Sequence, residues 1–318
     1  MCHETQIRVE HYESRHKALW DEFVSQSKNG VFLFYRDYLE YHADRFSDYS
    51  LLFFQGDYLI ALLPANREES AVISHGGLTF GGIISDSRMT TGLMLEIFSA
   101  MINELRKAGV KKLIYKAVPH MYHLLPAEED LYALFVHNAK LCRRDVSSTV
   151  IAGHRPPLAH GRKKTLKHVR ALGLRVEQSH DFSQFMAIAH ASLQLRHGLR
   201  PVHTPEEMEL LACRFPENIK LFALLRKQEM LGGVIIYESQ NVAHGQYRYA
   251  TEEGMELGAF DCLMDVLMNE VYVRKPYIDF GISMMDSGRK LNAGLVQNKE
   301  SFGARTTVYD FYELDTEL

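Results

Sequence analysis

An order of four elements that occurs twice is the feature that most limits the folds open to this chain. The first copy reads as a hairpin, a strand, a helix and a strand, at 51–64, 73–84, 91–108 and 112–118. The hairpin has two apolar runs joined by a short polar turn, Gln55-Gly56-Asp57, which is typical of antiparallel strands. Apolar residues at helical spacing predict the helix.

The second copy follows about 170 residues later, with the same order at 221–237, 242–250, 257–272 and 277–283. A helix that joins two strands of one sheet makes a parallel, right-handed crossover. Because the preceding hairpin is antiparallel, each sheet should be mixed. The pattern therefore predicts a duplicated α/β domain, and two unrelated α/β stretches of the same order remain the alternative.

A break near residue 150 separates the two copies. Residues 145–150 read as a last strand, and Pro156-Pro157 then interrupts regular structure because proline cannot donate a backbone hydrogen bond. A helix is expected over 158–172, and Thr204 with Glu207 forms a capping box for a later one. With 318 residues, we expect domains at 1–150 and 151–318.

Composition excludes several classes of protein. The chain is 46% hydrophobic and 24% charged, as in globular proteins, and its net charge of −4 gives no general attraction for nucleic acid or an anionic membrane. Its four cysteines form no C-x-x-C pair, so neither a zinc site nor a disulfide framework is expected. No signal-peptide pattern or run of 18 apolar residues occurs, which predicts a cytoplasmic protein without a membrane span.

Two short motifs could suggest other enzymes. Asp279-Phe280-Gly281 matches the kinase triplet, but no glycine-rich phosphate loop or H-R-D accompanies it. His75-Gly76-Gly77 could form an esterase oxyanion loop, but no G-x-S-x-G elbow exists. His120 and His123 lack an evident third metal ligand, so no metal site is expected.

The strand at 242–250 carries an unusual number of polar residues. Simple alternation places His244, Gln246 and Arg248 on one face, with Tyr247 and Tyr249 on the other. Gly245 within the strand indicates a bulge or a close backbone approach. These side chains either belong to a site or are satisfied polar residues of a half-buried sheet.

The strand at 277–283 should end at a ligand site, because α/β sheets bind ligands at the carboxyl ends of their strands. That end contains Gly281 and Ser283. Asp279 in an apolar strand is costly to bury without a partner. Lys299 and a ligand amine are the two partners we consider for it.

Lys299 lies at a helix end, in Lys299-Glu300-Ser301-Phe302-Gly303, with Gly303 as the capping glycine. A lysine here also suits the helix dipole, which is the structural alternative to a functional role. This motif, together with the strand at 277–283, resembles the end of the Fem-type and BioF2-like branch of the GNAT acyltransferases.

That resemblance implies a mixed α/β fold of tandem GNAT-like domains, with the first domain degenerate or shaping the acceptor site. It implies that the strands at 242–250 and 277–283 splay apart and admit an acyl thioester. Lys299 would stabilise negative charge on the reacting carbonyl, and His244 or Asp279 would act as the base. The implied donor-binding residues are Gly245, Gln246, Tyr247, Gly258, Ala259, Gly281 and Ser283.

The phosphate-binding signature of CoA-dependent GNAT enzymes is incomplete. At 251–259, Gly254, Gly258 and Ala259 leave room for a backbone approach, but the expected Gln or Arg is missing and three glutamates lie nearby. This departure leaves the identity of the donor open.

Several cationic segments could recognise a substrate. The helix at 158–172 is rich in Lys and Arg and is either a solvated face or a surface for a phosphorylated ligand. The loop at 195–203 and the polar loop at 286–292 offer Arg196, His197, His203 and Arg289 as candidate substrate-binding residues.

The function expected from the resemblance is transfer of an acyl group, acetyl in the first instance, from acyl-CoA to an amine. An amino sugar or a cell-envelope precursor is the expected acceptor. One alternative is a Fem-type transferase that uses aminoacyl-tRNA; another is a non-catalytic binding protein that keeps the fold.

Overall fold

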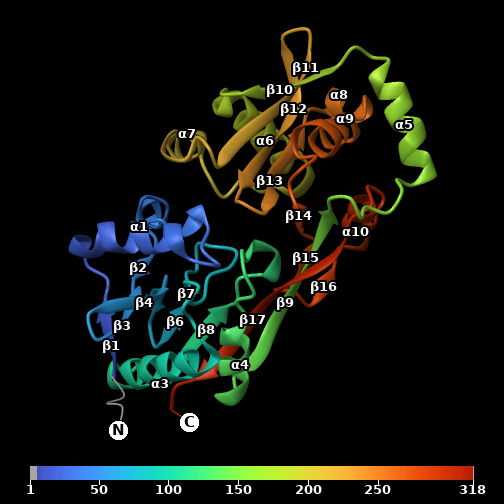
Figure 1. The fold of residues 1–318 in the computed structure, drawn as a ribbon. Coiled ribbons are helices and arrows are strands. Elements are labelled where there is room, and N and C mark those ends of the chain that lie inside the picture. The colour runs from blue at the N-terminus through green and yellow to red at the C-terminus, as the bar shows by residue number, and fades with distance from the viewer. Residues whose placement is uncertain (1–5, 318) are drawn as a thin grey trace. The chain divides into compact units, whose positions relative to one another are not determined.

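The computed structural model describes residues 6–317, which form two compact units (Figure 1). Unit 1 runs to Asp145 and also contains residues 286–290 and the segment from Val308 onward. Unit 2 contains Val146–Met285 and Leu291–Thr307. No helix among residues 6–317 is both long and apolar enough to span a membrane.

Unit 2 contains a mixed sheet in the order β10-β11-β12-β13-β14-β9. The pairing is antiparallel except between β13 and β14, which are parallel and joined by a helical crossover. The crossover comprises α8, α9 and a π-helical turn. The bounds are β10 Arg175–Ser179, β11 Ile219–Arg226, β12 Glu229–Glu238, β13 Val242–Ala250, α8 Glu252–Glu256, α9 Ala259–Val266, the turn Leu267–Val271, β14 Tyr277–Ile282 and β9 Lys140–Ile151.

Unit 1 repeats this order of pairing. Antiparallel strands β1-β3-β4, then β5-β6, lead to a parallel pair of β6 and β8 across helix α3, and β17 then pairs antiparallel with β8. Pro64-Ala65 divides β4 from β5, so this unit has two sheets. The bounds are β1 Ile7–His11, β3 Leu51–Gln55, β4 Tyr58–Leu63, β5 Asn66–Glu68, β6 Ala71–Ile73, α3 Thr91–Lys107, β8 Lys112–Lys116 and β17 Arg305–Asp315.

The remaining elements cover these sheets or connect their strands. Helices α6 and α7 lie between β10 and β11 in the chain, and the capping box predicted for Thr204 and Glu207 begins α7. The bounds are α1 Lys17–Gln26, α2 Arg36–Leu39, β2 Ser47–Asp48, β7 Ile84–Ser85, α4 Glu129–Val136, α5 His160–Arg170, α6 Phe182–His197, α7 Pro205–Arg214, β15 Met284–Met285, β16 Lys290–Leu291 and α10 Ala293–Glu300, with short 3-10 turns at Ser14–His16, Phe32–Phe34, Glu40–His42 and His120–Tyr122.

Each unit takes its last strand from a segment that enters it from the other part of the chain. The chain passes from unit 1 to unit 2 inside β9, and Ser147–Ile151 of that strand pair with β14. It passes back inside β17, whose residues Phe311–Asp315 pair with β8. The predicted boundary near 150 also falls within β9, but a single boundary does not include the return at 308.

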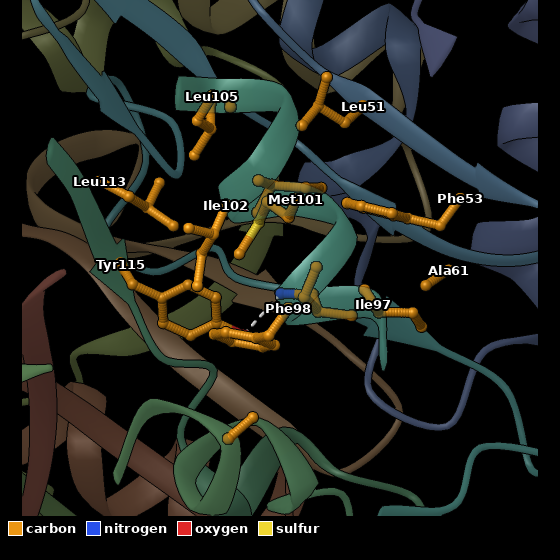
Figure 2. Packing of buried hydrophobic residues seen from close by; sticks show 14 of the residues in the cluster. Leu51, Phe53, Ala61, Ile97, Phe98, Met101, Ile102, Leu105, Leu113 and Tyr115 are labelled. Carbon is orange, nitrogen blue, oxygen red and sulfur yellow. Dashed lines mark hydrogen bonds between the residues drawn. The ribbon is translucent and has the colours of Figure 1, made fainter. Parts of the chain in front are cut away.

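The core of unit 1 follows from the helical spacing of α3. Thr90 caps this helix by accepting a hydrogen bond from the backbone N–H of Leu93. Its apolar stripe packs on residues of the sheet, as Figure 2 shows for Ile97, Phe98, Met101, Ile102 and Leu105 against Leu51, Phe53, Leu113 and Tyr115. Leu314 of β17 is buried in the same cluster.

The Leu314→Ala variant should lower the free energy of unfolding by about 2–5 kcal/mol, because the buried end of the leucine side chain is removed and a cavity remains. Hydrogen exchange should accelerate in β8, the strand that β17 pairs with. Val308→Ala, at an exposed position of the same strand, is the control and should stay within about 0.5 kcal/mol of the parent. Unchanged protection of β8 in the Leu314 variant would contradict the assignment of this strand to the core of unit 1.

Candidate active site

The two parallel strands of unit 2 separate after three pairs of residues. β13 and β14 are paired only at Val242–Tyr277, Ala243–Ile278 and His244–Asp279. β13 nevertheless continues to Ala250 and β14 to Ile282. Beyond His244, the side of β13 that faces β14 therefore has no ladder partner there. Such an opening exposes backbone N–H groups that an incoming ligand can use.

A bulge in β13 accompanies the opening. Opposite it, Ile236 of β12 pairs with Gly245 and Ile235 pairs with Tyr247, so Gln246 is an extra residue. A β-carbon on Gly245 would lie 3.6 Å from the carbonyl oxygen of Asp279. The sequence indicated a bulge or a close approach at this glycine, and the structure has the bulge, with only an ordinary van der Waals distance to Asp279.

The bulge makes the predicted side-chain alternation wrong for Arg248. An extra residue shifts all later side chains to the opposite face of the sheet. His244 accordingly contacts Asp279, whereas the guanidinium of Arg248 lies over the rings of Phe260 in α9 and of Phe280, the neighbour of Asp279 in β14. His244 and Arg248 therefore do not share a face.

Asp279 is the centre of a buried hydrogen-bond network. Its carboxylate lies 2.7 Å from Nδ1 of His244 and accepts hydrogen bonds from the hydroxyls of Ser147 at 2.6 Å and Thr149 at 3.1 Å. These partners offset the cost of burying a group that is 1% exposed. Lys299, one of the two partners considered from the sequence, makes no direct bond to this carboxylate.

Ser147 and Thr149 are the residues that sequence reasoning missed. Their separation by two positions in a strand places both hydroxyls on one face, and this signal was available. What was not available is that β9 crosses into unit 2 and lies beside β14.

The His244–Asp279 pair has the geometry of an oriented base. A carboxylate at Nδ1 favours the tautomer with the proton on that nitrogen, which leaves the lone pair on Nε2. The side chain of His244 is 14% exposed, whereas that of Asp279 is fully buried. Gly281 packs against the imidazole with φ of 76°, a conformation that favours glycine.

Lys299 reaches from α10 to the end of β14. Its ammonium donates to the carbonyl oxygens of Gly281 at 2.6 Å and Ile282 at 3.0 Å, and to the Ser283 hydroxyl at 2.8 Å. Burial, followed by the charge of Arg248, lowers the pKa of Lys299 to about 7, which the Asp279 carboxylate opposes. All three N–H bonds are used within the protein, so the side chain holds the strand end that carries Gly281.

The predicted donor loop is tightly packed against the protein itself. A β-carbon on Gly254 would lie 2.3 Å from the carbonyl oxygen of Leu231, and one on Gly258 would lie 2.8 Å from Cγ2 of Val169. Ala259 is fully buried. These small residues allow α8 and α9 to approach β12 and α5.

The candidate substrate-binding residues lie in different places. His203 is buried, with Nδ1 2.5 Å from the hydroxyl of Tyr247, and so anchors the α6–α7 loop to β13. Arg196 is exposed near the end of α6, and the side chain of His197 lies outside the described part of the chain. Arg289 belongs to the 286–290 segment of unit 1.

The corresponding position in unit 1 is closed. After β6, Ser74 donates its backbone N–H to Ile114 and Gly81 donates to Lys116, so the chain stays hydrogen-bonded to β8. The Lys116 ammonium is buried and donates to the carbonyl oxygen of His75 at 2.9 Å. The opening between parallel strands described for unit 2 is thus filled here.

Comparisons with known proteins place the fold. No protein-family model matches the sequence, and no curated protein does either. FemX is similar in structure over 97% of both chains, with a TM-score of 0.65 and 10% identity. A conserved protein of unknown function from Bacteroides thetaiotaomicron covers 96% of this chain and 98% of its own, with a TM-score of 0.59 and 11% identity.

The C-terminal domain of a putative lysylphosphatidylglycerol synthetase from Agrobacterium fabrum covers 80% of this chain and 81% of its own, with a TM-score of 0.54 and 10% identity. The chain has a Fem-type fold. At these identities the likeness concerns the fold alone, and it confirms the expected mixed α/β class. Among residues 6–317, no group of three or more His, Cys, Asp or Glu side chains could hold a metal ion.

The Lys299→Ala variant should lose about 1–3 kcal/mol of unfolding free energy, since two buried carbonyl groups lose their donor. A lysine that served only the helix dipole would contribute about 0.3–1 kcal/mol. Lys290→Ala, at an exposed lysine, is the matched control. Chemical denaturation measures both, and a stability like that of the control would argue against the strand-holding role.

The stability contributed by Lys299 should also depend on pH. Its folded pKa of about 7 lies below the ordinary 10.5, so the folded state binds fewer protons between these values. Stability relative to a Lys299→Met variant should therefore rise with pH from about 7 to 10 and be constant below 7. A difference that falls over this range would contradict the assignment.

Proposed function

We propose that this protein is an N-acyltransferase in which His244, oriented by Asp279, removes the proton from an attacking amine. The single observation that carries the proposal is the position of this pair. It lies where β13 and β14 separate, beside backbone groups that have no ladder partner. A base and a set of backbone donors at one opening are the two requirements of acyl transfer to an amine.

The reaction would proceed without a covalent enzyme intermediate. The amine nitrogen attacks the donor carbonyl carbon while Nε2 of His244 accepts its proton. Backbone N–H groups of β13 beyond His244 stabilise the oxyanion. When the tetrahedral species collapses, the bond to the leaving group breaks and the proton on Nε2 passes to that group. Lys299 contributes by holding Gly281 against the imidazole and by its positive field.

The expected donor is an acyl-CoA, used as a co-substrate, and the expected acceptor is an amino sugar or cell-envelope precursor. The alternative donor is an aminoacyl-tRNA, which the likeness to FemX favours. A non-catalytic binding protein of this fold is the third reading. A thermal-shift comparison of acetyl-CoA, longer acyl-CoA thioesters and bulk tRNA separates these, because a ligand stabilises the folded state it binds.

The His244→Gln variant should lower kcat by roughly 10²- to 10⁴-fold, because the general base is removed while a similar volume is kept. Asp279→Asn should also lower kcat, since an amide no longer selects the same tautomer. His180→Gln, at an exposed histidine, is the control. The measurement is steady-state turnover with the donor that the thermal-shift comparison identifies. Melting temperatures show whether each variant is folded. Full activity of His244→Gln would refute the role of this base.

A further inference from the structure

Arg248 is a half-buried cation whose side-chain donors have no partner among residues 6–317. It lies on β13 beyond the separation from β14, with its guanidinium carbon 5.3 Å from the ring centre of Phe260 and 5.7 Å from that of Phe280. With the residues between 6 and 317 it makes ring contacts, but no hydrogen bond or ion pair. A guanidinium carries five N–H donors, so an unpaired one can bind a ligand through several hydrogen bonds.

The surroundings of Arg248 have an excess of positive charge. Arg162 from α5 lies 3.9 Å over the ring of Phe302, which in turn packs on Phe280 at 5.7 Å. Desolvation, followed by the charge of Arg162, lowers the pKa of Arg248 to about 10, so the guanidinium is still charged at neutral pH. Arg248 in turn lowers the pKa of Lys299. These three cations therefore lie close enough to repel one another.

Two of the three cations already have partners. Arg162 donates to the Asp261 carboxylate at 2.8 Å, and Lys299 is bonded to the end of β14. Of these three cations, Arg248 is therefore the one whose donors can bind an anion. The rings of Phe260 and Phe280 hold its guanidinium in place, which lowers the entropy cost of using it.

We propose that Arg248 binds a phosphate group of the acyl donor. The inference rests on the proposed function, because it takes the donor to enter where β13 and β14 separate. The oxygens of a phosphate group match the donor geometry of a guanidinium, and the neighbouring Arg162 and Lys299 add to the attraction for its negative charge. The arginine absent from the expected position of the CoA signature is thus supplied from the preceding strand.

This phosphate chemistry has two sources, the phosphates of CoA and the phosphodiesters at the 3′ end of an RNA. Binding of coenzyme A, of pantetheine, which lacks phosphate, and of a short RNA hairpin ending in CCA should be measured by calorimetry. The proteins are the full chain, Arg248→Met, Arg248→Lys and the control Arg175→Met, which removes an exposed arginine of β10.

We expect Arg248→Met to weaken the binding of one phosphate-bearing probe by roughly 10- to 100-fold, the range for a charged hydrogen bond. Arg248→Lys should recover part of the loss, and Arg175→Met should bind like the parent. If coenzyme A is the probe affected, the binding of pantetheine should not change. If the RNA is affected, its salt dependence should also become shallower.

Equal binding by the parent and Arg248→Met would overturn the proposal, as would a loss that appears equally with pantetheine. Binding of neither phosphate-bearing probe by the parent would overturn it too. Because no acceptor or turnover is involved, an inactive His244 variant that binds the probe normally leaves this inference intact. Likewise, a neutral Arg248 variant does not count against acyl transfer at His244. Melting temperatures show whether each variant is folded.

Discussion

The burial of one carboxylate organises the second unit. Asp279 lies in the middle of β14, out of contact with water. An unpaired charge at such a position would destabilise the folded state by several kcal/mol. Two hydroxyls of β9 and the imidazole of His244 satisfy it. These contacts fix three strands side by side at the point where the sheet opens. A structural requirement and the orientation of the proposed base are thus met by the same set of bonds.

A second constraint acts at the end of the same strand. Gly281 has a backbone conformation that few other residues adopt, and the ammonium of Lys299 bonds to the two carbonyl groups at this turn. This contact joins a cation to backbone carbonyl oxygens, so it does not depend on the side chains of Gly281 and Ile282. An approach of the lysine to a reacting carbonyl would require these bonds to be exchanged, so in the structure its contribution is to position and to the local field.

Local pattern in the sequence was sufficient for most of the elements, because amphipathic spacing in 91–108 and the capping box at Thr204 are properties of adjacent residues. The strand predicted over 73–84 was wrong, since β6 ends at Ile73 and β7 begins only at Ile84, in another sheet. Local pattern also indicated the irregularity at Gly245. It could not give the face of Arg248, since one inserted residue reverses the alternation. The donors from Ser147 and Thr149 were out of reach, because they depend on which strands become neighbours across more than 100 positions of sequence. The contacts of Lys299 span fewer than 20 positions, but they depend on how α10 packs on the end of β14.

The crossing strands have a consequence for synthesis on the ribosome. Unit 1 is translated almost completely before unit 2, yet its sheet is finished only by residues 311–315, which pair with β8. Until those residues emerge, the nascent chain presents an unpaired, largely apolar strand edge, the kind of surface that promotes aggregation. Co-translational folding of the first half therefore stops one strand short, and its completion coincides with the end of the second. This topology therefore increases the need for chaperones during that interval, and this need is separate from the stability of the finished protein.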